Sequence, residues 1–298
     1  VGAFTDAMDL SGPDNTLTNN GAITAGNIGI YAAPTATNAT ITNSGTINAG
    51  DGILSKGANT TITNSGTIDA TLYGIDSSGA NTTITNSGSI TGDNAVVSSG
   101  DDVTITNSGT ITSTLFEGIF SSGDDATITN SGTITSTRSG IHSTGDDVTI
   151  TNSRTINAGN YGILSTGANA IITNSGSITG TTRDGIFSSG DDATITNSGT
   201  INAGDEGIDS EGTNAIITNS GSINAGDDGI NSVGDDVTIT NSGTITSGND
   251  GIDSAGANAI ITNSGSINAD DDGIFSTFAN AIITNSGTIT SGNDAIYS

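Results

Sequence analysis

A short segment built around Ile-Thr-Asn-Ser-Gly-Thr-Ile recurs almost unchanged along the whole chain. Thirteen copies follow one another at steps of 21 to 24 residues, so the mean repeat is about 22 residues long. A fixed period of this length is typical of solenoids, in which a unit buries its apolar side chains only by stacking on its neighbours. The repeat therefore restricts the chain to a stacked architecture.

Each repeat carries three apolar anchors, which are Ile128, Ile134 and Ile141 in one copy. Thr, Val, Ser, Gly, Asn and Asp surround them, and no stretch shows the spacing of an amphipathic helix. The β-branched residues favour strands, which the Gly and Asn-Ser-Gly interruptions keep short. We predict an all-β, right-handed parallel β-solenoid of triangular section, with about 13 coils of about 22 residues and three short strands per coil. Stacking at about 4.8 Å would give a rod roughly 60 Å long.

The domain organisation follows from where the repeat begins. Residues 17–298 are expected to form one continuous solenoid. Residues 1–16 depart from the repeat and include Met8 and Leu10, so we predict a cap over the open strand edges of the first coil. The chain starts at Val1 and stops in mid-coil at Ser298, which suggests a portion of a longer protein or an end covered by another subunit.

The alternation of a strand predicts which side chains enter the core. Ile128, Ile134 and Ile141 should point inward, together with Ser143, whereas His142 should point outward. A Ser recurs at this third-face position in every coil but the first, which has Ala32. We expect stacked hydroxyls or nearby backbone groups to satisfy this buried Ser column.

The Asn of Ile-Thr-Asn-Ser-Gly never varies among the copies. We expect it at a corner with left-handed backbone, with the amides stacked as a ladder along the axis. The Gly two positions later is expected to have positive φ, so Arg154, which replaces it once, indicates either a corner that is not left-handed or accepted strain. A row of ligand-binding amides is the alternative. The ladder residues are Asn43, Asn64, Asn86, Asn107, Asn130, Asn152, Asn174, Asn197, Asn219, Asn241, Asn263 and Asn285.

The charge balance excludes several classes of partner. The chain has 31 acidic and 4 basic residues, for a net charge of −27. Contacts with nucleic acid or an anionic membrane need cations, so neither partner is expected. The absence of Cys excludes a disulfide framework, and no apolar run is long enough to span a membrane.

An acidic column stands just before the third-face strand in six successive coils. Two carboxylates about 4.8 Å apart repel by roughly 1 kcal/mol in water, which solvated turns tolerate. Calcium would relieve the repulsion, although the Gly-Gly-x-Gly-x-Asp motif of calcium-binding solenoids is absent. Two interpretations stay open, solvated turns with no required cofactor and weak calcium sites. The residues are Asp184, Glu206, Asp228, Asp250, Asp272 and Asp294.

Other outward positions carry weaker patterns. Paired Thr columns, as at Thr104 and Thr106, resemble those of ice-binding solenoids, but Ile171 and its counterparts interrupt them. A broken apolar stripe on the third face includes Phe187 and favours scattered surface residues over a lateral contact. No coil has a long insertion, Trp is absent and the single His142 is expected on the surface, so we expect no catalytic residues and no enzyme.

The repeat units resemble the β-solenoid passenger domains of bacterial autotransporters and filamentous-haemagglutinin-like adhesins. The Ile-Thr-Asn-Ser-Gly-Thr-Ile motif carries the resemblance, over about residues 15–298. It implies a secreted, extracellular segment at a bacterial cell surface, with a structural or adhesive role as a stalk or adhesin passenger and an unknown host or environmental surface ligand. The alternatives are a self-assembling filament or surface-layer subunit, a homo-oligomer joined through solenoid ends, and an ice-binding solenoid.

Overall fold

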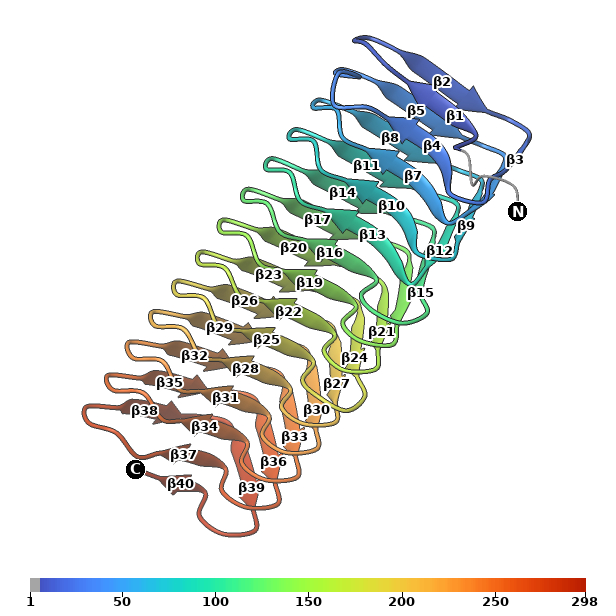
Figure 1. The fold of residues 1–298 in the computed structure, drawn as a ribbon. Coiled ribbons are helices and arrows are strands. Elements are labelled where there is room, and N and C mark those ends of the chain that lie inside the picture. The colour runs from blue at the N-terminus through green and yellow to red at the C-terminus, as the bar shows by residue number, and fades with distance from the viewer. Residues whose placement is uncertain (1–5) are drawn as a thin grey trace. The chain divides into compact units, whose positions relative to one another are not determined.

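The computed structural model describes residues 6–298. All of the regular secondary structure within that range consists of β-strands. The chain forms two compact units, residues 1–145 and residues 146–298. In each unit three strands make one coil, and strands at the same place in successive coils pair in parallel (Figure 1). The predicted all-β parallel solenoid, with about 13 coils of about 22 residues, is confirmed. The right-handed sense of the coil stays a prediction.

The first unit, described from residue 6, contains three parallel sheets. The first sheet holds β2 (Thr16–Asn19), which reads Thr-Leu-Thr-Asn, and the Thr-Ile-Thr-Asn strands β5 (Thr40–Asn43), β8 (Thr61–Asn64), β11 (Thr83–Asn86), β14 (Thr104–Asn107) and β17 (Thr127–Asn130). The second holds β3 (Ala22–Thr24), β6 (Thr46–Ala49), β9 (Thr67–Ala70), β12 (Ser89–Gly92), β15 (Thr110–Ser113) and β18 (Thr133–Ser136). The third holds β1 (Met8–Leu10), β4 (Ile28–Ala32), β7 (Asp51–Ser55), β10 (Tyr73–Ser77), β13 (Asn94–Ser98), β16 (Ile119–Ser121) and β19 (Ile141–Ser143).

The second unit repeats this arrangement. Its first sheet holds β20 (Thr149–Asn152), β23 (Ile171–Asn174), β26 (Thr194–Asn197), β29 (Ile216–Asn219), β32 (Thr238–Asn241), β35 (Ile260–Asn263) and β38 (Ile282–Asn285). Its second holds β21 (Thr155–Ala158), β24 (Ser177–Gly180), β27 (Thr200–Ala203), β30 (Ser222–Ala225), β33 (Thr244–Ser247), β36 (Ser266–Ala269) and β39 (Thr288–Ser291). Its third holds β22 (Ile163–Ser165), β25 (Ile186–Ser188), β28 (Ile208–Ser210), β31 (Ile230–Ser232), β34 (Ile252–Ser254), β37 (Ile274–Ser276) and β40 (Ile296–Tyr297).

The register places identical residues of successive coils on one another. Ile217 pairs with Ile239 and Asn219 with Asn241, for example, so each sheet stacks Ile on Ile along the axis. The predicted inward residues Ile128, Ile134 and Ile141 are all 0% exposed. The core therefore consists of three columns of Ile, one from each sheet, packed against one another. A single coil could not bury these side chains alone.

The invariant asparagines form a hydrogen-bonded ladder within each unit, and all of them except the exposed Asn285 are buried. The amide nitrogen of Asn43 donates to the side-chain oxygen of Asn64 at 2.7 Å, and that of Asn219 donates to Asn241 at 2.8 Å. The same amide of Asn64 also donates to the carbonyl oxygen of Gly66 at 3.3 Å. Asn64 thus links two coils and closes its own corner.

The prediction of left-handed backbone at this corner is wrong. Neither the ladder asparagines nor the Gly that follows them are among the described residues with positive φ. The left-handed residues lie instead in the Gly-Ala-Asn and Gly-Asp-Asp turns before the first sheet, as at Asn81 (φ 55°) and Asp236 (φ 58°). Asn and Asp are the residues that best tolerate that conformation, so the turn explains its own composition.

The Gly of the Asn corner packs closely against the preceding coil and does not have positive φ. A Cβ placed on Gly221 would lie 2.1 Å from the carbonyl oxygen of Gly199 in the preceding coil. Arg154 stands at the equivalent position in another coil and has no positive φ. Of the two explanations offered by the sequence, the corner that is not left-handed is therefore correct.

The buried Ser column of the third sheet lacks the partners that the sequence led us to expect. Ser77 donates to the Thr82 hydroxyl at 3.3 Å, but the position of Thr82 holds Ala or Val in the coils that follow. The backbone groups beside the column are already engaged in the parallel ladders. Hydroxyls without a partner belong to Ser55, Ser98, Ser121, Ser143, Ser165, Ser188, Ser210, Ser232, Ser254 and Ser276.

The segment assigned to a cap contributes a strand to the stack. β1 pairs in parallel with β4, with Met8 opposite Ile30, and Leu10 is 6% exposed. Residues 1–5 of the predicted cap lie outside the described residues. The capping role of this segment stays a prediction.

Candidate functional site

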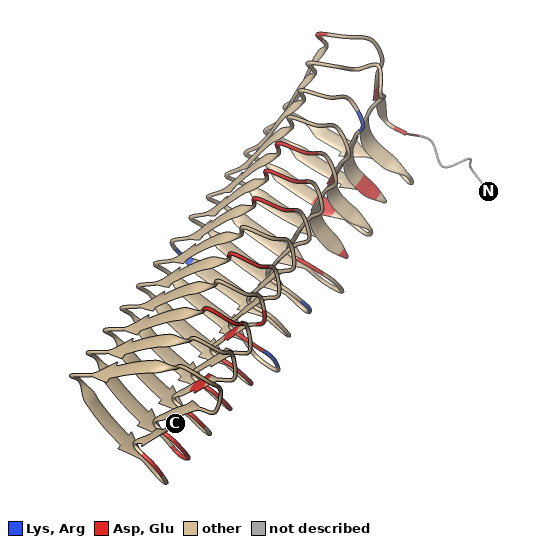
Figure 2. Cartoon of the chain, turned by 90° about the vertical axis from the view of Figure 1, so that its left-hand side faces the viewer, with Lys and Arg blue, Asp and Glu red and all other residues tan. Residues whose placement is uncertain are grey.

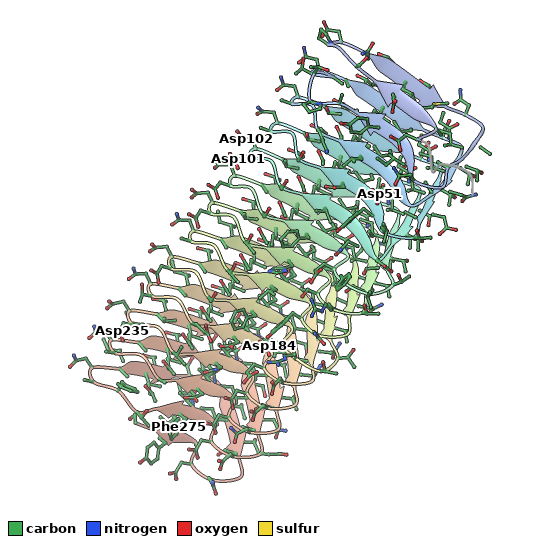
Figure 3. The ribbon with its side chains drawn as sticks, in the orientation of Figure 1. Asp51, Asp101, Asp102, Asp184, Asp235 and Phe275 are labelled. Atoms are coloured by element: carbon green, nitrogen blue, oxygen red, sulfur yellow. The ribbon has the colours of Figure 1, made fainter. Side chains whose placement is uncertain are left out.

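The predicted acidic column lies at the corner that leads into the third sheet of the second unit. Each member stands two residues before a strand, as Asp184 does before β25. Acidic residues recur at such turns along this unit (Figure 2). Asp184 lies at the other end of the coil from Asp235, which belongs to the Gly-Asp-Asp turns (Figure 3). Asp184, Asp228, Asp250 and Asp272 are buried, Glu206 is half-buried and Asp294 is exposed.

Part of the column has a structural role. A side-chain oxygen of Asp228 accepts the backbone N–H of Asp250 at 2.9 Å. Asp250 accepts that of Asp272 at 2.8 Å, and Asp272 accepts that of Asp294 at 2.8 Å. These carboxylates form a second ladder along the axis, which explains why an acidic or amide side chain is favoured at this corner.

Asp184 and Glu206 differ from that ladder because they contact other carboxyl groups. Carboxyl oxygens of Asp184, Asp205 and Glu206 all lie within 4.8 Å of one another. Carboxylates this close repel each other when both are ionised, which favours a proton on one of them. Burial, with the neighbouring Glu206 side chain acting in the same direction, raises the pKa of Asp184 to about 8. A pKa of about 8 favours the carboxylic acid form of Asp184 at neutral pH.

Asp209 brings a fourth carboxyl group to this place from the outward face of β28. Burial, followed by the charge of Glu206, raises the pKa of Asp209 to about 7. Its side-chain oxygen accepts a hydrogen bond from the Asn231 amide at 3.2 Å. We call Asp184, Asp205, Glu206 and Asp209 the acid cluster.

An aromatic pair borders the acid cluster. Phe187 pairs in register with Asp209, and its ring centroid lies 5.6 Å from that of Tyr161 in a tilted arrangement. The Arg183 guanidinium lies 5.7 Å from the centre of the Tyr161 ring. Acidic groups and apolar ring surface thus share one stretch of the third sheet.

The acidic column predicted from the sequence contains only two of the four members of the acid cluster, Asp184 and Glu206. It separated the corner column from the outward stripe of the third face and therefore placed Asp184 and Phe187 in different patterns. The register joins the two, because Phe187 lies opposite Asp209 in the next coil. The signal that could have found the cluster is the density of acidic residues at 205, 206, 209 and 211.

Comparison with known proteins yields one likeness. No family model matches the chain, and no curated protein matches it. A solved structure that does match is the catalytic domain of a GH87 alpha-1,3-glucanase variant in complex with tetrasaccharides, at 14% sequence identity and a TM-score of 0.32. The match covers 96% of this chain, which spans 64% of the length of that domain. At this level the likeness extends to the β-helical fold alone.

The comparison corrects the expected functional class. We expected a non-enzymatic structural or adhesive rod, with filament and ice-binding roles as alternatives. The matching solenoid is instead a catalytic domain, so the expectation of a non-enzymatic chain is withdrawn. Among residues 6–298, no helix is long and apolar enough to cross a membrane.

Proposed function

We propose that the chain hydrolyses glycosidic bonds and that the acid cluster of the second unit is its catalytic site. The observation that carries the proposal is the close group of carboxyls, in which oxygens of Asp184, Asp205 and Glu206 lie within 4.8 Å of one another around the buried Asp184. Glycoside hydrolysis needs such a pair, with a neutral acid to protonate the leaving oxygen and a carboxylate opposite it.

The four groups divide into roles by their environments. Asp184 is the general acid, because burial and Glu206 raise its pKa to about 8. Glu206 is a positioning residue that raises the pKa of Asp184. Its carboxyl oxygen lies within 4.8 Å of that of Asp184, closer than the carboxylate spacings of known glycosidases. Asp209 lies on the neighbouring outward face and serves as the base or nucleophile once it is ionised.

The charge and shape of the surroundings favour a neutral polysaccharide as substrate. A net charge of −27 repels a polyanionic chain such as a uronic acid polymer. The Tyr161–Phe187 pair offers apolar ring surface on which the carbon face of a sugar can rest. The proposed substrate class is therefore neutral glucans, galactans, mannans or xylans.

A reducing-end assay on a panel of these polysaccharides tests the proposal. Asp184 must be protonated and Asp209 ionised, so the pKa values of about 8 and about 7 predict greatest activity between them. Asp184→Asn should lower the rate by about 100-fold or more. Glu206→Gln should move the alkaline limb of the pH profile to lower pH, since it removes the group that holds the Asp184 proton.

The matched control is Asp272→Asn, in the same column and also buried. Its side-chain oxygen can still accept the Asp294 N–H, so both the fold and the activity should be retained. Hydrolysis of no polysaccharide in the panel, or equal loss in the two Asn variants, contradicts the proposal.

Calcium at the column, raised by the sequence, competes with this role. The ligands would be Asp184, Asp205 and Glu206, whose oxygens lie within 4.8 Å of one another. A calcium ion requires ionised carboxylates, so it would displace the proton on which the acid function depends. Calorimetric titration with calcium chloride at neutral pH separates the two. We expect no heat of calcium binding at the acid cluster. Stoichiometric calcium binding that is lost in Asp184→Asn would mean that these carboxyl groups bind a metal and that Asp184 is not a general acid.

The placement of the chain at a bacterial cell surface, outside the cell, belongs to the same proposal. It rests on the resemblance of the repeats to autotransporter passengers and filamentous-haemagglutinin-like proteins. Accessibility of the native protein to protease on intact cells tests it, and protection until lysis would contradict it. Homo-oligomerisation through solenoid ends stays a prediction.

A further inference from the structure

A hollow of about 290 Å³ lies on the outward side of the third sheet in the first unit. Parallel pairing brings its walls together from successive coils, with Tyr73 opposite Asn94 and Phe120 between Val97 and His142. The lining residues are Tyr73, Asn94, Val97, Glu117, Phe120 and His142, which we call the outward pocket.

The floor of the outward pocket is apolar and aromatic. The ring centroids of Phe120 and His142 lie 5.0 Å apart in an edge-to-face arrangement, with Val97 beside Phe120. Tyr73 is 36% exposed at the rim. These rings present a surface suited to the carbon face of a small cyclic ligand.

The polar groups of the outward pocket supply both donors and acceptors. One Glu117 oxygen lies 3.9 Å from His142 Nδ1 and 3.9 Å from Arg138 Nη1. The neighbouring His142 side chain lowers the pKa of Glu117, which is therefore an ionised acceptor. The side-chain oxygen of Asn94 accepts the Glu117 N–H at 3.3 Å, which leaves its amide nitrogen as a donor.

The charges in the outward pocket decide the ligand class. An anion would meet the Glu117 carboxylate, and a cation would compete with Arg138 for that group. A neutral polyol has hydroxyls that both donate and accept and a carbon skeleton for the rings. The volume is at the small end of the range of ligand pockets, which suits one ring.

We propose that the outward pocket binds a single residue of a neutral saccharide, as a non-catalytic site separate from the acid cluster. The two sites lie in different units, and saccharide binding in the outward pocket does not require that the acid cluster hydrolyse glycosidic bonds. Loss of hydrolysis in Asp184→Asn should leave saccharide binding unchanged, so either idea can fail without the other.

Saturation-transfer NMR with methyl glycosides of glucose, galactose, mannose, N-acetylglucosamine and fucose tests the proposal. We expect one or more of them to bind with a Kd on the order of 1 mM, a weak but measurable affinity. Phe120→Ala and Glu117→Gln should each weaken that binding by about tenfold or more, because one removes the ring surface and the other the charged acceptor.

Phe275→Ala is the matched control. Phe275 occupies the corresponding outward position in the second unit and stacks on Tyr297 at 5.1 Å, away from any Glu–His pair. Binding should be retained in this variant, and circular dichroism should show all variants folded. The proposal is overturned if no glycoside binds, if binding survives both pocket variants, or if tetramethylammonium or sulfate is bound in preference to the sugars.

Discussion

The buried serines of the third sheet are polar side chains whose hydroxyls the fold leaves unsatisfied. Ser210 is 0% exposed, and its hydroxyl has no partner. Such a group costs about 1–3 kcal/mol in lost hydration. We expect Ser210→Ala to raise the free energy of unfolding by about 1 kcal/mol, measured by urea denaturation.

The control for this prediction is Ser77→Ala. Ser77 donates to Thr82 at 3.3 Å, so its replacement should not stabilise the protein. A Ser210→Ala variant that loses more than about 1 kcal/mol would mean that the hydroxyl has a partner in solution.

The backbone conformations were less predictable from sequence than the side-chain ladders. The amide ladder depends only on Asn recurring in register, which the repeat guarantees. The left-handed position depends on the path of each corner. The sequence does mark the left-handed positions, because the residue two positions before each strand of the first sheet, such as Asn81 or Asp236, is always Asn or Asp.

A single strand, β29, contains a matched test of the core. Ile217 is 0% exposed in the Ile column, whereas the adjacent Ile216 is 49% exposed on the outward face. Ile217→Ala should lower the free energy of unfolding by about 2–5 kcal/mol, from lost burial and the cavity left behind. Ile216→Ala should change it by less than about 0.5 kcal/mol.

Thermal and urea unfolding of the two variants measure this difference. Equal stability of Ile216→Ala and Ile217→Ala would contradict the inward and outward assignment of the first sheet. The sequence predicted this assignment correctly, because period-two alternation is independent of how the corners turn.

The acid cluster could not be predicted from the individual strands and corners. The corner column was visible as a sequence pattern, and so was the outward stripe of the third face. Their proximity depends on the side chains of Glu206 and Asp209 meeting Asp184 in the preceding coil. The burial that keeps Asp184 protonated is a property of the packed corner, and no spacing rule supplies it.

The pH dependence of stability follows from four carboxyl groups of the second unit. Burial raises the pKa of Asp184 to about 8, of Asp209 and Asp228 to about 7, and of Asp253 to about 6. Because these values exceed the ordinary 3.8, the folded chain binds protons more tightly than the unfolded chain. The resulting stabilisation is complete below about pH 4 and is lost as the pH rises through the folded-state values.

Thermal melts followed by circular dichroism should therefore show a Tm that falls as the pH rises from about 5 to about 8. Repulsion within a chain of net charge −27 acts in the same direction. Asp184→Asn should flatten the upper part of this slope, while Asp272→Asn should leave it unchanged. A Tm that rises across the window would contradict the raised pKa values.

For the molecule as a whole, the repeat determined the architecture and said little about activity. Stacked Ile columns can be predicted from any one coil. The acid cluster and the outward pocket depend instead on departures from the repeat, such as Glu117, His142 and Glu206. Each of these side chains acts only together with residues of another coil.

The proposed activity depends on Asp184 holding a proton at neutral pH. Carbon-13 NMR of aspartate-labelled protein measures this directly, with Asp184→Asn assigning the carboxyl signal. The account predicts a titration midpoint near the pKa of about 8. A midpoint near the ordinary value of 3.8 would mean an ionised carboxylate at neutral pH and would contradict the proposed acid.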